Sequence, residues 1–310
     1  MKYVLGFDGG GTKTESVLMD ETGAILARSR SGASNAVNVG LEASAAALAE
    51  AGLQALHLAA KRPEEVAYIV AGISGAGEPK ARLSIQCALQ PTFPNAAIII
   101  TSDLVLTLGA TGEIPSLVVI AGTGSAVMGR TEPLKLARAG GFGPIIGDPG
   151  SANDIGRKAT ALCFQKFLNG EKKFPLIEQI LLSFECKWDQ FVDLVRDQPT
   201  ATFPKIFPIV AKVAESGDPS ARALLTSAAK DLQEQVQEVL RQLDLQNASF
   251  FLAKTGGVFD GSVFLNAEFE RMVREIAPHA RMGPLPRPVA EYVAEFARGV
   301  LTHPLQIPES

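Results

Sequence analysis

Hydrophobic and polar positions follow two patterns along this chain, and each pattern predicts a different kind of element. In the first pattern, an apolar run stops at a cluster of glycine and threonine and then resumes, at residues 3–19 and again at 117–128. Each run predicts a β-hairpin, with its tip at residues 9–11 or 122–124. In the second pattern, apolar residues recur at helical spacing, most clearly along 219–243, which predicts an amphipathic helix.

The order of the elements predicts an α/β protein of two domains. The first half reads as β-β-β-α-β-α-β-α, typical of a layered α/β domain, with strands within 3–19 and at 24–30, 66–71 and 96–101, and helices at 41–60, 79–89 and from about 104. The second half restarts at Ser116, and we expect the second hairpin, a loop at 138–150, helices at about 175–190, 219–243 and 288–301, and a strand at 249–254. A short connection near 111–115 gives domains of 1–113 and 114–310, with the alternative that the last helix packs back on the first domain.

The two hairpin tips consist mostly of backbone. Such a tip can bring its N–H groups close to an anion, and Thr12, Thr123 and Ser125 add hydroxyl donors. A P-loop is excluded because Thr12 stands where its lysine belongs and a strand, not a helix, follows. A Rossmann fingerprint fails for the same lack of a helix. Two tips about a hundred residues apart therefore indicate the two halves of a duplicated nucleotide-binding fold.

Composition and charge narrow the class of protein. The chain has 310 residues, of which 46% are hydrophobic and 20% charged, and a net charge of −4, so we expect a globular protein without a basic surface for nucleic acid. No apolar run reaches the roughly 18 residues of a membrane span, and no signal segment opens the sequence. Cys87, Cys163 and Cys186 form no C-x-x-C pair. These features predict a cytoplasmic protein in a reducing compartment.

The order of the motifs carries a resemblance over essentially the whole chain. The motifs are DGGGT at 8–12, Asp103 at a strand end, AGTGS at 121–125, GGFG at 140–143 with GDPGSA at 147–152, and TGGV at 255–258. This order resembles the acetate-kinase, sugar-kinase, heat-shock-protein-70 and actin superfamily, and within it the N-acetylglucosamine kinase branch that is grouped with the BadF/BadG/BcrA/BcrD ATPases. The resemblance implies a two-domain actin-like ATPase (ribonuclease H-like) fold with the active site in the interdomain cleft.

The activity that the resemblance implies is an ATP-dependent amino-sugar kinase. Such an enzyme transfers the γ-phosphate of ATP, with Mg²⁺, to the 6-hydroxyl of N-acetylglucosamine or a close relative. Three alternatives stay open: a glucosamine kinase, a sugar-responsive binding protein, and an ATPase that activates a dehydratase or reductase. The last class bridges an iron–sulfur cluster with paired cysteines, which this chain lacks. A small-molecule sugar is thus the expected partner, without nucleic acid or membrane, and a homodimer is left open.

The resemblance also implies roles for individual residues. Asp103 matches the general base, and Asp8 is expected to hold Mg²⁺ through water. The residues expected to bind ATP and its phosphates are Gly10, Gly11, Thr12, Lys13, Thr123, Gly124, Ala214, Gly256 and Gly257. Those expected to bind the sugar are Asn35, Asp103, Thr123, Gly124, Phe142, Gly143 and Asp148, with Asn38 as an alternative to Asn35. Phe142 departs from the family, because some relatives carry tryptophan there; phenylalanine keeps the apolar wall but lacks the indole N–H donor.

Several of these residues also have a purely structural interpretation. Asp103 could be the N-cap of a helix that starts at Leu104, since aspartate is a favoured capping residue. Asp148 could be a turn aspartate ahead of a proline. Lys13 could simply face solvent, and Gly256 could belong to an ordinary strand-to-helix turn.

Overall fold

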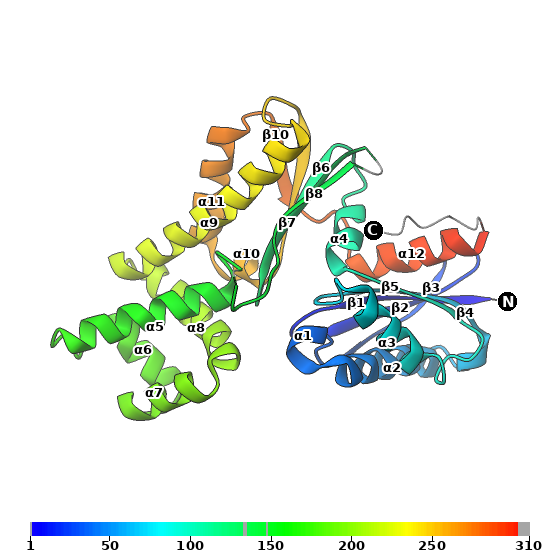
Figure 1. Ribbon diagram of the computed structural model, residues 1–310, viewed down its shortest axis with the longest axis horizontal. Coiled ribbons are helices and arrows are strands. Elements are labelled where there is room, and N and C mark those ends of the chain that lie inside the picture. Colours follow the sequence, from blue (N-terminus) through cyan, green and yellow to red (C-terminus); the bar gives the residue numbers. More distant parts are fainter. Residues whose placement is uncertain (1, 133–134, 147, 303–310) are drawn as a thin grey trace. The chain divides into compact units, whose positions relative to one another are not determined.

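The computed structural model describes residues 2–132, 135–146 and 148–302, which form two compact units (Figure 1). One unit consists of residues 1–112 and 285–310, and the other of residues 113–284. The α/β class expected from the sequence is confirmed.

The first unit is built on a five-stranded sheet with the order β3-β2-β1-β4-β5. Its strands are β1 (Tyr3–Gly9), β2 (Thr14–Asp20), β3 (Ile25–Ser31), β4 (Val66–Ile73) and β5 (Ala97–Thr101). Its helices are α1 (Ala36–Val39), α2 (Leu41–Leu58), the 3-10 helix η1 (Pro63–Glu65), α3 (Pro79–Leu89), α4 (Asp103–Gly109) and α12 (Val289–Thr302). The expected antiparallel meander β1-β2-β3 is present, and β1, β4 and β5 run parallel.

Helices cover both faces of this sheet, which explains why β1 is apolar at nearly every position. Leu5 and Phe7 point into a core shared with α2 and α3, whereas Val4 lies in a second core that α12 completes (Figure 1). Gly6 allows α12 to approach, because a Cβ at this position would clash with the backbone of Ala294. The last helix therefore belongs to the unit that contains the N-terminus.

The second unit repeats the same sheet plan. Its sheet has the order β10-β9-β6-β7-β8. Read from the other end, β8-β7-β6-β9-β10, this is the order of the first sheet, with β6 in the central place of β1. Its strands are β6 (Ser116–Ala121), β7 (Ser125–Glu132), β8 (Lys135–Gly140), β9 (Phe250–Thr255) and β10 (Ala280–Pro284). Its helices are α5 (Ala152–Leu168), α6 (Pro175–Ser183), α7 (Trp188–Asp197), α8 (Pro199–Glu215), α9 (Pro219–Leu243), α10 (Gly257–Gly261) and α11 (Val263–Ile276). The matching order supports the duplication that the two tips predicted.

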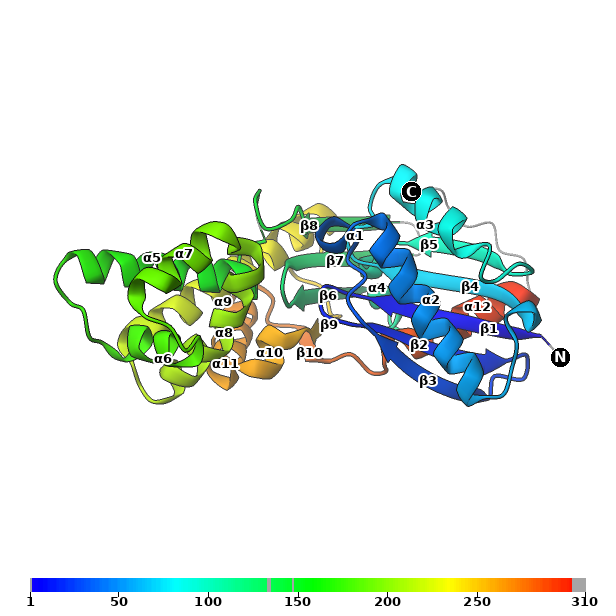
Figure 2. The ribbon, with the colours of Figure 1, turned by 90° about the horizontal axis from the view of Figure 1, so that it is seen from below.

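Two predictions for the second unit are corrected. The single helix at 175–190 is two helices, because the chain leaves helical geometry after Ser183 and Glu185 adopts a φ of +49°. The predicted loop at 138–150 begins later, since β8 continues to Gly140. Helix α8 was not predicted, because its Pro204 and Pro208 are typical helix breakers. It packs against α5, α6 and α7 (Figure 2).

Candidate active site

Asp8 and Asp103 lie at the same edge of the first sheet. Strands β1, β4 and β5 are parallel, so their carboxyl ends meet at one edge, where α/β proteins bind ligands. Asp8 is the register partner of Gly72, which in turn pairs with Thr101, two residues before Asp103. A Cβ built on Gly72 would lie 3.3 Å from the Cα of Asp103. Parallel pairing thus gathers the predicted base and the predicted magnesium ligand.

Asp103 is not the N-cap of its helix. Ser102 holds that position, and its Oγ accepts a hydrogen bond from the Leu104 N–H at 3.3 Å. Asp103 is the first residue of α4, and its Oδ1 also accepts from Leu104 N–H, at 2.9 Å. The capping interpretation of Asp103 is therefore wrong in detail, because the adjacent serine supplies the cap.

Asp8 sits in surroundings that disfavour its negative charge. Burial raises the pKa of Asp8 to about 7, with further increases from the negative charges of Asp103 and Glu15. The nearby Lys13 offsets only part of this effect. An excess of carboxylate charge fits a bound cation. Within the described ranges no cluster of three or more His, Cys, Asp or Glu side chains could hold a metal, so Mg²⁺ at Asp8 would need further oxygens from water and phosphate.

The tip of the first hairpin keeps backbone donors available. The Gly10 N–H donates to the Lys13 carbonyl, and the Gly10 carbonyl accepts from the Asn35 N–H, both at 3.0 Å. Across the part of the chain that the structure describes, the N–H groups of Gly11 and Thr12 have no protein acceptor. Both residues are exposed. The tip is therefore held in place at its base while two N–H groups and the Thr12 hydroxyl face solvent.

Lys13 is already engaged. Its Nζ lies 2.9 Å from Oε1 of Glu15, which also pairs with Arg30 at 2.6 Å. The Lys13 side chain is about half exposed, at 53%. A phosphate at the tip would have to compete with Glu15 for this ammonium group, so the role of Lys13 stays a prediction.

Asn35 is oriented by a double contact. Its Oδ1 accepts from the N–H groups of Val37 (3.0 Å) and Asn38 (3.1 Å), which caps α1. Its Nδ2 donates to Ser74 Oγ at 3.0 Å, leaving one amide hydrogen for a ligand. Ser74 was not predicted as a site residue. Its place in the glycine-rich run after β4 was the available signal, because that run follows a parallel strand end.

In the second unit, Asp148 contacts two other predicted residues, Gly143 and Gly124. Its Oδ1 accepts a hydrogen bond from the Gly143 N–H at 3.2 Å. Its Oδ2 lies 2.5 Å from where a Cβ of Gly124 would be. Burial raises the pKa of Asp148, while the Gly143 N–H and the positive charge of Arg138 counteract the rise. These contacts tie the carboxylate to the loop and the hairpin tip, and the role of Asp148 in sugar binding stays a prediction.

The tip of the second hairpin is joined to the start of α5. The Gly122 N–H donates to the Gly124 carbonyl at 2.9 Å, and the Gly122 carbonyl accepts from the Ala152 N–H at 2.8 Å. The Asn153 N–H donates to the Thr123 carbonyl at 3.4 Å. The carbonyl groups of the tip are thus turned towards the protein, while the Thr123 side chain remains partly exposed.

Ser125 fastens both ends of the loop that carries Phe142, Gly143 and Asp148, one through its backbone and one through its side chain. Ser125 accepts the Gly141 N–H through its carbonyl at 2.8 Å and donates its hydroxyl to the Pro149 carbonyl at 2.8 Å. Buried Gln235 on α9 donates to the same carbonyl at 2.9 Å. Sequence reasoning missed Gln235, because its contact spans 86 residues.

The glycine pair after β9 meets the second tip at its base. Gly256 has a φ of +106°, and a Cβ there would clash with the Ala121 carbonyl at the end of β6. Gly257 is exposed, with open space where a side chain would point. Ala214 is fully buried, and its carbonyl accepts from Arg222 Nε at 3.0 Å. A nucleotide could thus contact Gly257 without a steric clash. Ala214 has no exposed surface, so a nucleotide could contact it only if neighbouring residues moved.

Gly147, part of one sequence motif, lies outside the described residues.

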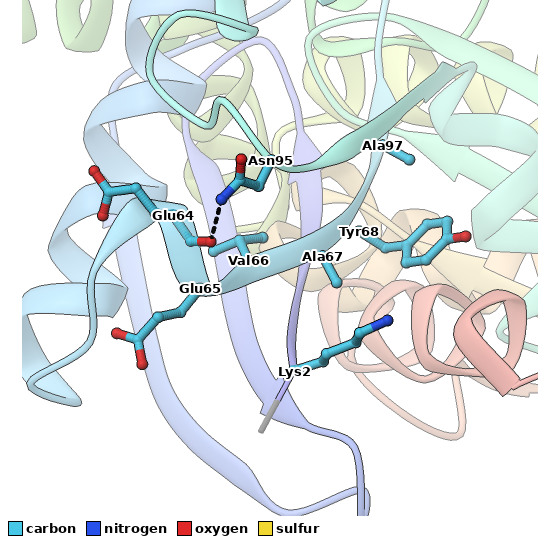
Figure 3. Close-up of a pocket in the computed structure, with 8 residues that line it drawn as sticks. All are labelled: Lys2, Glu64, Glu65, Val66, Ala67, Tyr68, Asn95 and Ala97. Carbon is cyan, nitrogen blue, oxygen red and sulfur yellow. Dashed lines mark hydrogen bonds between the residues drawn. The ribbon is translucent and has the colours of Figure 1, made fainter.

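A pocket of about 430 Å³ lies elsewhere on the first unit (Figure 3). It is lined by Lys2, Glu64, Glu65, Val66, Ala67, Tyr68, Asn95 and Ala97. These residues stand at the amino ends of β1, β4 and β5, opposite the edge with Asp8 and Asp103. The pocket is therefore separate from the candidate active site.

Two sheets of the same strand order, each with a glycine-rich hairpin tip, define an actin-like ATPase fold. Over residues 5–283 the sequence matches the BadF/BadG/BcrA/BcrD ATPase family, and the chain belongs to this family. The resemblance seen in the sequence is confirmed.

Relatives and a solved structure extend over nearly the whole chain. The N-acetylmuramic acid/N-acetylglucosamine kinase of Clostridium acetobutylicum is 30% identical over 289 residues, 91% of this chain and 94% of the relative. The N-acetyl-D-glucosamine kinase of Dictyostelium discoideum is 27% identical over 294 residues, 90% and 92% of the two chains. A crystal structure of a candidate N-acetylglucosamine kinase from Chromobacterium violaceum shares the fold, with a TM-score of 0.80, 24% identity, and coverage of 96% of this chain and 99% of that chain.

Proposed function

We propose that this protein is an ATP-dependent amino-sugar kinase that phosphorylates the 6-hydroxyl of N-acetylglucosamine or a close relative. The observation that carries the proposal is that Asp8 and Asp103 lie at the same edge of the first sheet. The tip of the first hairpin, where the N–H groups of Gly11 and Thr12 have no acceptor among the described residues, directly follows Asp8. Phosphoryl transfer needs mainly positioning, charge stabilisation and a group that accepts the proton of the attacking hydroxyl. The two relatives named as amino-sugar kinases support the choice of acceptor.

Each residue has a defined task in this proposal. Asp103 accepts the proton of the sugar hydroxyl, and Asn35 and Asp148 bind other hydroxyls as acceptors or donors. The N–H groups of Gly11 and Thr12, with the hydroxyl of Thr123, donate to phosphate oxygens. Mg²⁺ near Asp8 would neutralise phosphate charge when it is bound. Gly257 offers open backbone to the adenine ring.

The proposal is tested by sugar-dependent ADP release. We expect the purified protein with ATP and Mg²⁺ to release ADP when N-acetylglucosamine is present, and to release far less with glucose. A preference for glucosamine over its N-acetylated form would instead favour the glucosamine kinase. Absence of sugar-dependent ADP release with every amino sugar would contradict the kinase.

The dehydratase activator finds no support in the cysteines. Cys87 is exposed on α3, and Cys163 is buried in α5, where burial raises the pKa of its thiol to about 12. An inert buried thiol is a poor cluster ligand.

No helix in the described residues could cross a membrane. Location in the cytoplasm and assembly as a homodimer both remain proposals, which fractionation and analytical ultracentrifugation would test.

A further inference from the structure

Arg222 connects the end of one helix to the start of another in the second unit. It lies in the first turn of α9, and its Nε donates to the carbonyl of Ala214, in the last turn of α8, at 3.0 Å. Its guanidinium lies over the ring of Phe264, the second residue of α11, with 5.4 Å between Cζ and the ring centroid. Helix α11 packs against α8, α9 and α10 (Figure 2). Contacts with two other helices therefore fix the orientation of this side chain.

Two residues expected to bind adenine belong to these same helices. Ala214 is fully buried, whereas Arg222, which binds its carbonyl, is exposed. Gly257 begins α10 and is exposed, with open space where a side chain would point. Val263, the first residue of α11, is an apolar residue that is 77% exposed. A ligand at this surface would therefore meet Arg222 where the sequence had predicted a contact with Ala214.

The open face of the Arg222 guanidinium is chemically suited to a flat ring. Phe264 covers one face of the group, and the residue as a whole is exposed, so the opposite face is turned to solvent. A guanidinium is planar and delocalised, and it stacks on aromatic rings. Every nucleotide base presents such a ring, whatever groups its edge carries. Phe264, Arg222 and a base can thus form a stack of three layers.

We propose that Arg222 and Phe264 bind the base of the nucleotide, with the guanidinium stacked between the base and the Phe264 ring. The inference rests on the proposed kinase function and adds two residues to its nucleotide site. The bond to the Ala214 carbonyl orients the guanidinium before the base arrives, so less conformational entropy is lost on binding. Arg222 strengthens nucleotide binding and takes no part in phosphoryl transfer itself.

The test separates the base of the nucleotide from its phosphates. ADP carries both, whereas pyrophosphate carries only phosphates. With Mg²⁺ present, calorimetry gives the Kd of ADP, and competition against ADP gives that of pyrophosphate. In Arg222→Gln we expect the Kd of ADP to rise about tenfold, within the range for the stacking of one base, and that of pyrophosphate to stay unchanged. Phe264→Leu keeps an apolar side chain but removes the ring, and should raise the Kd of ADP by a smaller factor.

Arg222→Lys distinguishes stacking from simple attraction between charges. Lysine keeps the positive charge but has no planar group, so we expect ADP to bind nearly as weakly as in Arg222→Gln. ADP affinity close to that of the wild type in Arg222→Lys would mean that charge alone acts, and would overturn the inference. In kinetic measurements, Arg222→Gln should raise KM for ATP and leave kcat close to the wild-type value, because the stack is the same in the ground state and the transition state.

Arg241→Gln is the matched control. It removes the same charge from the same helix, about 28 Å further along, and should leave both affinities unchanged. The inference is overturned if Arg222→Gln binds ADP as tightly as the wild type does. It is also overturned if Arg222→Gln loses ADP and pyrophosphate affinity equally, which would mean that Arg222 only holds the end of α8. A wild type that binds neither ADP nor ATP would instead refute the proposed kinase function.

Discussion

The carboxylate of Asp148 occupies the space that a side chain on Gly124 would need. A Cβ built on Gly124 would lie 2.5 Å from Asp148 Oδ2, closer than real Cβ contacts come. The absence of a side chain at the hairpin tip therefore lets a buried carboxylate approach it. The same carboxylate accepts the Gly143 N–H, so the tip and the loop at 141–148 depend on one another.

This dependence predicts the effect of Gly124→Ala. The added methyl group should push Asp148 out of place and loosen its bond to Gly143. Since misplacement by about 1 Å can cost ~10²-fold in rate, we expect kcat/KM for the sugar to fall by up to that factor. Gly122→Ala is the comparison, because nothing lies within 4 Å of its added Cβ. Equal losses in the two variants, measured by steady-state kinetics, would argue against the contact.

The hydroxyls of the two tips can be tested through nucleotide binding. Mg²⁺ and ATP should raise the melting temperature by mass action. Thr12→Val and Thr123→Val each remove a donor at nearly constant volume, so we expect a smaller rise at a given ATP concentration. Thr14→Val serves as the contrast, because Thr14 is buried and its hydroxyl forms hydrogen bonds with the Gly32 carbonyl and Ser34 Oγ within the protein. It should lower the melting temperature without ATP instead. A full ATP-induced rise in both tip variants would exclude the tips as phosphate ligands.

Asp8 predicts an unusual dependence of stability on pH. Burial and the neighbouring carboxylates raise the pKa of Asp8 in the folded protein from 3.8, the ordinary value of an aspartate, to about 7. A raised pKa means that the folded state binds the proton more tightly, so the contribution of Asp8 to stability is lost as the pH rises through about 7. Asp8→Asn should therefore unfold at higher denaturant concentration than the wild type at pH 8. The advantage should shrink towards pH 5.

Asp20→Asn provides a control of opposite sign for that experiment. Hydrogen bonds from Thr22 and Ala24 hold the pKa of Asp20 below its usual value. A lowered pKa stabilises the folded state above the unfolded pKa, so Asp20→Asn should lose stability at pH 8. Urea denaturation without metal or nucleotide measures both variants. An Asp8→Asn protein that is less stable than the wild type at pH 8 would contradict the electrostatic account.

The sequence predicted those parts of the candidate site that depend on residues close together in the chain. The glycine tips follow apolar strands directly, and Asp103 follows a strand end, so short-range reasoning finds them. Gln235 and Ser74 were missed because their contacts join residues far apart in sequence. Helix α8 was missed because tertiary packing overrides the unfavourable propensity of its prolines.

The last prediction concerns Asp103. A general base and a purely structural residue at this position predict different effects of substitution on turnover and on stability. Asp103→Asn keeps the size of the side chain and an oxygen that can accept from Leu104 N–H, but it cannot take the proton of a hydroxyl. A positioned general base contributes ~10²–10⁴-fold in rate, so kcat should fall at least about 10²-fold while ATP still raises the melting temperature.

Ser102→Ala is the control, and we expect the opposite result from it. It removes the N-cap of α4, which typically costs about 1 kcal/mol of stability, and should leave turnover close to that of the wild type. Melting temperature and sugar-dependent ADP release, measured on both variants, separate the two roles. A stable Asp103→Asn protein with near-normal turnover would show that another group accepts the proton.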